Sequence, residues 1–311
     1  MEKINPRDVY GDTLVKLGEK DPNIVVLDAD LAKSTKTIKF GKKFPERFFD
    51  MGIAEANMIS VAAGLASCGK TAFVSTFAVF VPGKVYDQIR MSVAYSNMNV
   101  KMFSTHAGVS VGKDGASHQM LEDIALMRVM PNMKIFAPSD PFQTGRIVEL
   151  MAQNYGPMYA RVGREAMYPI YKEDELEDLK IGESIQLRDG DDVTIVAHGM
   201  MVREAISAHE ILKKKGISAE IIDMWTIKPL DEKKILSSAG KTGRIVAVEE
   251  HSIIGGMGSA VAEVLSENKI DAAFKRMGIR DVFCESGDPY DLFKKYHLTD
   301  RDIAKTAESL L

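Results

Sequence analysis

The sequence has few cysteines and no long apolar run. Cys68 and Cys284 are the only cysteines among 311 residues, which argues against a disulfide scaffold or a zinc site. Both lie in or beside apolar segments, so both are expected to be buried thiols in a reducing compartment. No run of 18 apolar residues is present, so no membrane span is expected. The first residues lack the apolar core of a secretory signal, which favours a cytoplasmic protein.

The sequence also lacks a strong excess of either charge. Its 40 basic and 44 acidic residues give a net charge of −4, so neither nucleic acid nor an anionic membrane is an expected partner. What it does have is the composition of a globular enzyme, 45% hydrophobic and 27% charged. A chain of this length is expected to form two domains. Alternating apolar strands and helices predict α/β folds with mainly parallel sheets.

The central stretch of the chain, residues 50–80, places one acid, Glu55, at the start of a long apolar segment. Residues 54–68 predict a helix buried nearly all round, with Gly69 at its C-cap, and residues 71–80 predict a buried strand. Burial at the mouth of an apolar pocket disfavours the charged form of an acid, which can then hold or share a proton near neutral pH. The alternative is an ordinary helix-start acid that interacts with the helix dipole.

Polar residues follow a predicted buried strand at residues 24–27. They run from Asp28 and Asp30 to Ser34 and Thr35. Ligands of parallel α/β sheets bind beyond the carboxyl ends of strands, so this loop suits a polar ligand. A loop whose acids and hydroxyls only cap helices is an equally good interpretation.

The loop after a third predicted strand, residues 100–105, contains the most chemically active side chains. His106, Asp114 and His118 lie there among three glycines. Glycines let a backbone approach a ligand closely, and histidines supply donors and a proton switch near neutral pH. The spacing of the histidines fits neither a zinc site nor a dinucleotide fingerprint. Their position on both sides of an Asp-Gly turn favours a functional loop over a structural one.

The first domain is predicted to end with a strand, residues 158–162, that carries Arg161. An arginine at a strand end suits bidentate phosphate recognition, although a surface ion pair is the commoner role. The acidic stretch that follows, residues 171–188, predicts a solvated linker. The linker would separate a first domain of residues 1–170 from a second of residues 189–311.

The second domain contains one glycine-rich turn, Gly255-Gly256-Met257-Gly258, directly before a predicted helix. A helix N-terminus of this kind can bind phosphate. Such turns also serve tight packing, which we expect here. His198 and His251 are likewise expected to be structural or interface residues.

In this order, the motifs resemble those of the C-terminal half of transketolase, the thiamine-diphosphate enzyme of the pentose phosphate pathway. The resemblance covers essentially the whole chain, and the ordered set of motifs is highly specific. The matching positions are Ala29-Asp30-Leu31-Ala32-x-Ser34, Gly52-Ile53-Ala54-Glu55, Ser75-Thr76-Phe77-x-x-Phe80, Thr105-His106, Gly112-Lys113-Asp114-Gly115-Ala116-Ser117-His118-Gln119, Arg161 and Arg7. One departure is that Val81-Pro82-Gly83 replaces a further aromatic residue that the family often has there.

This resemblance implies two three-layer α/β/α domains, a pyrimidine-binding domain followed by a transketolase C-terminal-type domain. It implies a transferase that moves a two-carbon ketol unit from a ketose phosphate, such as xylulose 5-phosphate, to an aldose phosphate. The implied cofactor residues are Glu55, which protonates the aminopyrimidine ring of thiamine diphosphate, Phe77 and Phe80, which pack on that ring, and Asp30. The implied substrate residues are His106 and His118, which also shuttle protons, Asp114 on a sugar hydroxyl, and Arg161, Ser34 and Arg7 on the phosphate.

The Gly-Asp-Gly and Asn motif that holds the diphosphate and its metal in complete enzymes has no counterpart in this sequence. Gly287-Asp288-Pro289 is interpreted as a turn. The resemblance is therefore to the small, C-terminal subunit of a split transketolase, with no metal ligand expected in this chain. A separate N-terminal subunit is expected to bring the diphosphate and its Mg²⁺ or Ca²⁺. The implied assembly is a cytoplasmic α2β2 heterotetramer in which this chain also pairs with itself.

Three alternatives stay open from the sequence. A 1-deoxyxylulose-5-phosphate synthase resembles this half too, but it is usually one long chain and typically lacks a histidine at the position of His106. The beta-type subunit of a 2-oxo-acid dehydrogenase has the same two-domain layout, but it lacks the loop with two histidines. The third alternative is a non-catalytic assembly subunit. The joint presence of Glu55, both histidines and Arg161 argues against it.

Overall fold

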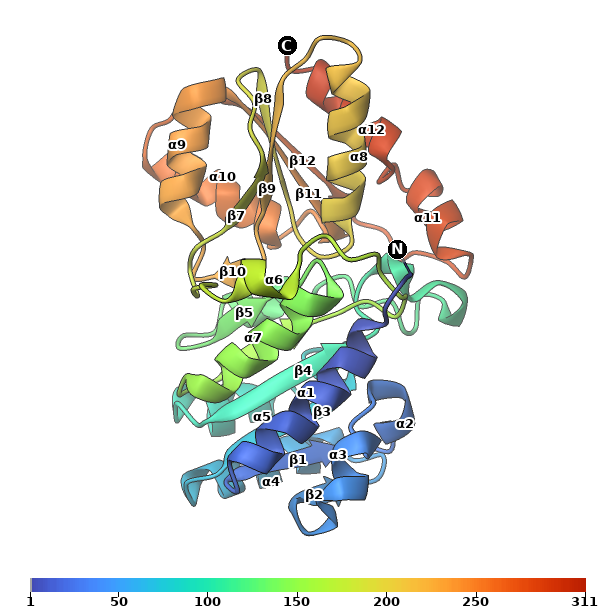
Figure 1. Ribbon diagram of the computed structural model, residues 1–311, viewed down its shortest axis with the longest axis vertical. Helices are drawn as coiled ribbons and strands as arrows, with labels where there is room; N and C mark the ends of the chain where they lie inside the picture. Colours follow the sequence, from blue (N-terminus) through green and yellow to red (C-terminus); the bar gives the residue numbers. More distant parts are fainter. Residues whose placement is uncertain (1) are drawn as a thin grey trace. The chain divides into compact units, whose positions relative to one another are not determined.

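A computed structural model describes residues 2–311 and divides the chain into two compact units (Figure 1). The first unit comprises the chain through Ala107 together with Leu126–Leu179, and the second comprises Gly108–Ala125 and Lys180–Leu311. The sequence predicted one division of the chain, at a linker of residues 171–188. The structure differs in two places: the segment Gly108–Ala125 groups with the second unit, and strand β7 (Ile185–Arg188) begins inside the predicted linker.

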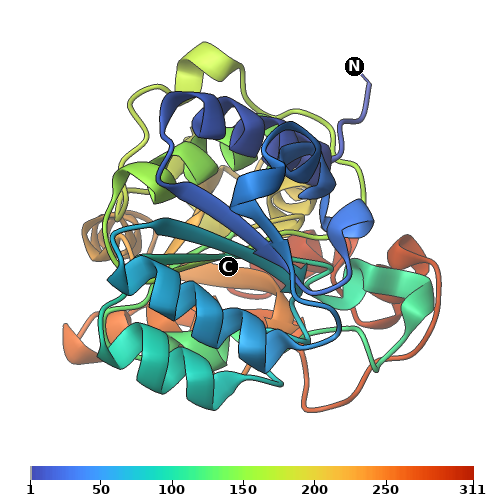
Figure 2. The same ribbon diagram turned by 90° about the horizontal axis from the view of Figure 1, so that it is seen from below.

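The first unit is a parallel sheet between two layers of helices. Its strands lie in the order β5-β6-β4-β3-β1-β2, and each neighbouring pair is parallel. Figure 2 shows α1 and α7 over one face and α4 with the π-helix η2 over the other. The elements are α1 (Pro6–Lys20), β1 (Ile24–Asp28), α2 (Ala32–Thr35), α3 (Ile38–Lys43), η1 (Pro45–Arg47), β2 (Phe48–Asp50), α4 (Glu55–Ser67), β3 (Thr71–Phe77), α5 (Tyr86–Gln88), η2 (Ile89–Tyr95), β4 (Val100–Thr105), β5 (Lys134–Phe136), α7 (Pro141–Gln153), β6 (Met158–Arg161) and η4 (Glu173–Leu176).

The second unit is a five-stranded sheet in the order β12-β11-β8-β9-β7, parallel except for the β7–β9 pair. The helices α8 and α12 pack together, as do α9 and α10 (Figure 1). The elements are η3 (Val109–Asp114), β7, β8 (Val193–Ala197), α8 (Met201–Lys213), β9 (Ala219–Asp223), β10 (Thr226–Lys228), α9 (Glu232–Thr242), β11 (Arg244–Ser252), α10 (Met257–Glu267), β12 (Ala273–Ile279), α11 (Pro289–Lys295) and α12 (Asp300–Glu308). The helix α6 (Asp123–Arg128) spans the point where the chain passes from this unit back to the first. The predicted fold class is thus confirmed.

Local sequence signals account for the positions of several elements. The side chain of Asn5 accepts the N–H of Arg7, and Pro6 follows at the first helical position, which starts α1. Asp140 caps α7 in the same way by accepting the N–H of Gln143. All five residues of β1 are buried, as a central parallel strand requires. Within residues 2–311, no helix has the length and apolarity needed to cross a bilayer.

One prediction about α4 is wrong. The helix is not buried nearly all round, because Ala56, Ser60 and Gly64 lie on an exposed stripe that continues to Cys68. Cys68 is accordingly exposed, which contradicts the predicted buried thiol, whereas Cys284 is buried as predicted. The misassignment has a physical cause, since small residues have an apolar character whether they face the core or an open surface.

Candidate active site

The predicted residues of the first unit gather at the carboxyl edge of its sheet. Asp28 ends β1, Phe77 ends β3, His106 follows β4 and Arg161 ends β6. The strand register places Asp28 opposite Ser75, Phe77 opposite Thr105 and Arg161 opposite Ser104. Because all these strands are parallel, their carboxyl ends meet at the same edge, where ligands of α/β sheets bind.

Glu55 begins α4 shortly after the carboxyl end of β2, and its side chain is buried. Its Oε2 lies 2.6 Å from the Nζ of Lys84, a side chain that is 53% exposed. The same Nζ lies 5.9 Å from the ring centroid of Phe80, so Glu55 and Phe80 flank one ammonium group. Sequence reasoning missed Lys84, because nothing in a single sequence links two residues that are 29 positions apart.

Phe77 contributes an aromatic stack to the same edge. The Phe77 and Phe80 rings are nearly parallel, at 13°, with centroids 6.0 Å apart. The imidazole of His106 stacks on Phe77 at 3.8 Å, and its Nδ1 lies 2.9 Å from the Oγ1 of Thr105. Only 4% of His106 is exposed, and it takes a positive φ of 58°. Since His106 covers part of Phe77, the half-exposed Phe80 ring is the better placed of the two to contact a ligand ring.

The predicted phosphate residues of the first unit fall into two places. Arg7 donates from Nη1 to the carbonyl of Ser34 at 3.1 Å, so these two residues are brought together. Burial, together with the nearby charge of Arg164, lowers the pKa of Arg7. Arg161 is 4% exposed at the end of β6, so it lies inside the fold rather than in a surface ion pair.

Asp28 organises the loop that carries Asp30 and Ser34. Its Oδ2 accepts the hydroxyls of Thr35 and Thr37 at 2.6 and 2.7 Å, and its Oδ1 accepts the N–H of Leu31 at 2.8 Å. Burial raises the pKa of Asp28 to about 6, even though these hydrogen bonds favour the carboxylate. Asp28 and Thr35 therefore match the capped-loop interpretation. Asp30 differs, because its side chain is exposed and its φ is +60°.

Asp114 and His118 belong to the second unit. Both lie in a loop that contains the short helix η3 and turns at Gly112 and Gly115, each with a φ of 76°. Asp114 is exposed, and His118 is half-exposed with its Nδ1 3.0 Å from the Oγ of Ser117. The predicted site residues are thus divided between the two units: Asp114 and His118 belong to the second, and the others belong to the first.

The glycine-rich turn before α10 binds a side chain of the protein itself. The two oxygens of Glu249 accept the N–H groups of Met257 and Gly258 at 2.8 and 2.9 Å. A Cβ on Gly256 would lie 2.3 Å from Glu249 Oε2, so glycine is required for this close approach. The turn serves tight packing, as expected, with a carboxylate where a phosphate could have bound. The buried His198 and His251 lie beside Glu249, in structural positions.

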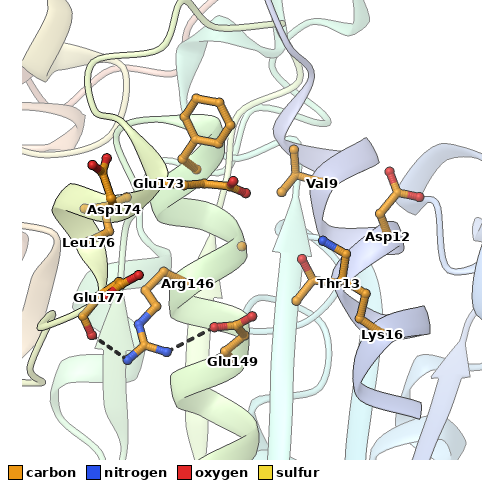
Figure 3. Close-up of a pocket in the computed structure, with 12 residues that line it drawn as sticks. Val9, Asp12, Thr13, Lys16, Arg146, Glu149, Glu173, Asp174, Leu176 and Glu177 are labelled. Carbon is orange, nitrogen blue, oxygen red and sulfur yellow. Dashed lines mark hydrogen bonds and ion pairs between the residues drawn. The ribbon is translucent and has the colours of Figure 1, made fainter. Parts of the chain in front are cut away.

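The first unit also contains a pocket of about 690 Å³ between α1, α7 and η4 (Figure 3). Arg146 spans one side of it, with one nitrogen 3.0 Å from Glu149 and another donating to the carbonyl of Glu177 at 2.8 Å (Figure 3). Most of its charged lining residues are acidic, and it contains none of the predicted site residues. We assign it no role in the chemistry. In residues 2–311, no group of three or more His, Cys, Asp or Glu side chains is placed to hold a metal ion.

Comparison with known proteins shows which family this chain resembles. The model of the transketolase pyrimidine binding domain matches residues 2–169, and that of the transketolase C-terminal domain matches residues 182–303. A Clostridium protein named 6-deoxy-6-sulfo-D-fructose transketolase subunit SqwH is 41% identical over 304 residues, which are 98% of this chain and 94% of that protein. An apulose-4-phosphate transketolase subunit of Phocaeicola vulgatus is 40% identical over 301 residues, 97% of this chain and 96% of that protein.

A solved structure gives the same result for the fold. It is a split-gene transketolase described as an inactive beta4 tetramer, 49% identical to this chain, with a TM-score of 0.92. The match covers 99% of this chain and 98% of that one. Both family domains are present in order, and these similar proteins are matched over almost their whole length. The chain therefore belongs to the transketolase family, as the C-terminal subunit of a split transketolase.

Proposed function

We propose that this chain, together with a separate N-terminal subunit, forms a thiamine-diphosphate-dependent transketolase. The enzyme moves a two-carbon ketol unit from a ketose phosphate of the xylulose 5-phosphate type to an aldose phosphate. The single observation that carries the proposal is the meeting of a buried carboxyl, an aromatic stack and a histidine at one edge of the first sheet, formed by Glu55, Phe80 and His106. A subunit with only a structural role has no need for this combination.

The residues of the first unit fit the pyrimidine half of the cofactor. Glu55 is sheltered from water, as a group that holds a proton against a ring nitrogen must be. Phe80 offers a half-exposed ring face close to the ammonium that pairs with Glu55. The cofactor, when bound, supplies the carbanion chemistry, while the protein orients and protonates. Asp30 completes the proposed cofactor contacts from the neighbouring loop.

The remaining predicted residues take the substrate. Arg7, with Ser34 at its side, and Arg161 bind the sugar phosphate, where planar guanidinium groups give charge and direction. His106 and His118 contact the carbonyl and hydroxyls of the sugar and move protons between them. Asp114 accepts a hydrogen bond from a hydroxyl of the donor sugar. These assignments follow the order of the family motifs, residue by residue.

The proposed partner subunit holds the diphosphate and its Mg²⁺ or Ca²⁺ and completes the site. Two features, one just before α4 and one on it, support a surface that another chain covers. Ile53, just before Glu55, is 77% exposed, and the exposed stripe of Ala56, Ser60 and Gly64 lets a second backbone approach closely. We propose an α2β2 heterotetramer, with the chain alone forming an inactive self-assembly like the one described for its split-gene relative.

The test is reconstitution. The chain is purified alone and with a transketolase N-terminal subunit from the same genome, and ketol transfer from xylulose 5-phosphate to ribose 5-phosphate is measured with and without thiamine diphosphate. Activity only in the two-chain, cofactor-loaded sample is expected. Carbon dioxide release from pyruvate instead would favour a deoxyxylulose-phosphate synthase-like activity. No turnover with any donor would favour an assembly subunit.

The donor sugar needs its own comparison. One similar protein is named for a sulfosugar and another for apulose 4-phosphate, so the family fold accepts donors with different ends. We propose a phosphate-bearing donor for this chain, because its proposed substrate residues include the guanidinium groups of Arg7 and Arg161. A panel of xylulose 5-phosphate, fructose 6-phosphate and their unphosphorylated sugars separates the possibilities. Higher kcat/KM for the phosphorylated donors is the expected result.

A further inference from the structure

The loop that carries Asp114 and His118 is held by a buried glutamate of the second sheet. Glu250 lies on β11, 140 residues beyond the loop, and is 4% exposed. Its Oε2 accepts the backbone N–H of Ser110 at 3.1 Å. A carboxylate that accepts a backbone N–H away from water makes a strong, directional contact. This contact fixes the start of η3, the short helix that ends at Asp114.

The backbone at the start of the loop is shaped to fit Glu250. Gly108 has a φ of 83°, and a Cβ added there would lie 2.4 Å from Glu250 Oε2. Only glycine satisfies both the backbone conformation and the close approach. The N–H of Gly108 then donates to the carbonyl of Met120 at 2.9 Å, which closes the loop on itself. Glu250 therefore touches the loop where the two sides of the loop meet.

Further contacts from the second unit fix the far side of the same loop. The amide nitrogen of the buried Gln119 donates to the carbonyls of Val109 and Glu285 at 3.2 and 3.0 Å. The hydroxyl of Ser286 donates to the carbonyl of Lys113. The N–H of Ser252 donates to the carbonyl of Leu121 at 2.7 Å. These contacts explain why Gly108–Ala125 groups with the second unit and not with the sheet that precedes it.

We propose that Glu250 is a positioning residue for the sugar phosphate. It fixes the loop so that Asp114 and His118 are presented to the substrate in one arrangement. The second unit then does more than support assembly, since it fixes a loop that binds the substrate. The inference rests on the proposed function for the identity of the substrate, while the fixing of the loop stands on the contacts alone.

The experiment compares Glu250→Ala with Glu250→Gln in the full-length chain assembled with its N-terminal subunit. Glu250→Ala removes the acceptor of the Ser110 N–H, and Glu250→Gln keeps an oxygen in the same place. Glu220→Ala is the matched control, because Glu220 is equally buried in the same unit but pairs with Lys234, at 2.8 Å, away from the loop. Amide hydrogen exchange of residues 109–119 and steady-state kinetics are measured on all of them.

In Glu250→Ala, exchange across residues 109–119 is expected to rise about tenfold, as loss of a buried charge-assisted hydrogen bond implies. KM for the ketose phosphate is expected to rise by a similar factor, with kcat and the affinity for thiamine diphosphate close to wild type. Glu250→Gln is expected to recover most of both effects. Glu220→Ala is expected to leave residues 109–119 unchanged, even if it lowers the thermal midpoint.

Unchanged exchange of residues 109–119 in Glu250→Ala would overturn the proposal, as would an equal rise in Glu220→Ala. A change in kcat alone would overturn the positioning role as well. Failure of the proposed function has a different signature, because the wild-type complex would then show no ketol transfer at all. The exchange measurement would still decide whether Glu250 fixes the loop.

Discussion

Each unit contains a buried glutamate near the N-terminus of a helix, Glu55 as the first residue of α4 and Glu249 on β11 with its carboxylate at the start of α10. The two carboxylates are held in different ways. Glu249, 1% exposed in the second unit, gives both oxygens to backbone N–H groups of Met257 and Gly258. Glu55, 2% exposed in the first unit, meets the ammonium of Lys84, a side chain that is 53% exposed. Backbone amides in a packed turn cannot move aside, whereas a half-exposed lysine can. Burial alone therefore does not distinguish a structural carboxyl group from one available to a ligand. The group that donates to the carboxylate does distinguish them.

The largest effect expected from this comparison is on activity, at Glu55. Glu55→Gln removes the group proposed to hold a proton against the cofactor ring, so ketol transfer by the two-chain complex should fall about 10²–10⁴-fold. The free energy of unfolding should change by only about 1 kcal/mol, because the partner lysine is half-exposed. Turnover assays and urea unfolding measure the two quantities. Glu19→Gln is the control, since it removes another Glu–Lys pair of the same unit, Glu19–Lys43, on the surface.

The second expected effect is on stability, at Glu249. Glu249→Gln sets an amide NH₂ against a backbone N–H of the α10 turn, which should cost about 2–3 kcal/mol of unfolding free energy. Burial would raise the pKa of Glu249, but His198, His251 and the N–H of Gly258 hold that pKa below its ordinary value of 4.5. The carboxylate therefore stabilises the fold above that value and loses its contribution as pH falls through the lowered pKa.

Urea unfolding at pH 7 and at pH 3.5 tests this prediction. The difference between wild type and Glu249→Gln should shrink at the lower pH, while Glu267→Gln, on the exposed end of the same helix, should show no difference at either. Equal stability of Glu249→Gln and wild type at pH 7 would remove the basis for calling Glu249 structural.

Much of the fold was predictable from the sequence because local signals set it. Asn5 and Pro6 start α1, Asp140 starts α7, and the strand predicted at residues 100–105 coincides with β4. The exposed stripe of α4 was not predictable, because alanine and glycine occur both in cores and on open surfaces. The grouping of Gly108–Ala125 with the second unit was not predictable either, because it depends on contacts with β11, over 100 residues away.

The site shows the same limit. The order of motifs indicated Glu55, His106 and Arg161. These residues follow or end strands of one parallel sheet, so they lie at the same edge of it. What the motifs did not indicate was how each side chain is held. The pairing of Glu55 with Lys84 and the stacking of His106 on Phe77 are tertiary contacts, for which the sequence contains no local signal.

A third buried acid, Asp28, extends the comparison because two of its donors are hydroxyl groups. Hydroxyls of Thr35 and Thr37 hold it, and burial still raises its pKa from 3.8 to about 6. A raised pKa means that the contribution of this group to stability is full below about pH 3.8 and is lost as pH rises through 6. The shift corresponds to roughly 3 kcal/mol between the two ends of that range.

Asp28→Asn removes this titration and keeps the hydrogen-bonding shape, since the Thr35 hydroxyl can also donate to the carbonyl of Leu31. Relative to wild type, the variant should gain unfolding free energy as pH rises from 4 to 7. Urea unfolding at both pH values measures the difference. Parallel curves for the two proteins would mean that the hydroxyls stabilise the Asp28 carboxylate as well as charged donors do.

The smallest expected effect, and the most direct test of the comparison, is at Lys84. The carboxylate of Glu55 accepts a hydrogen bond from the Lys84 ammonium. If Glu55 contacts the proposed cofactor, a ring nitrogen of the cofactor must take the place of that ammonium. A half-exposed ion pair contributes about 1 kcal/mol, so Lys84→Met should bind thiamine diphosphate up to about fivefold more tightly in the two-chain complex. Isothermal titration measures this, with the exposed Lys233→Met as control. Weaker binding in Lys84→Met would instead mean that Lys84 contacts the cofactor itself. The proposal that the cofactor displaces Lys84 from Glu55 would then be wrong.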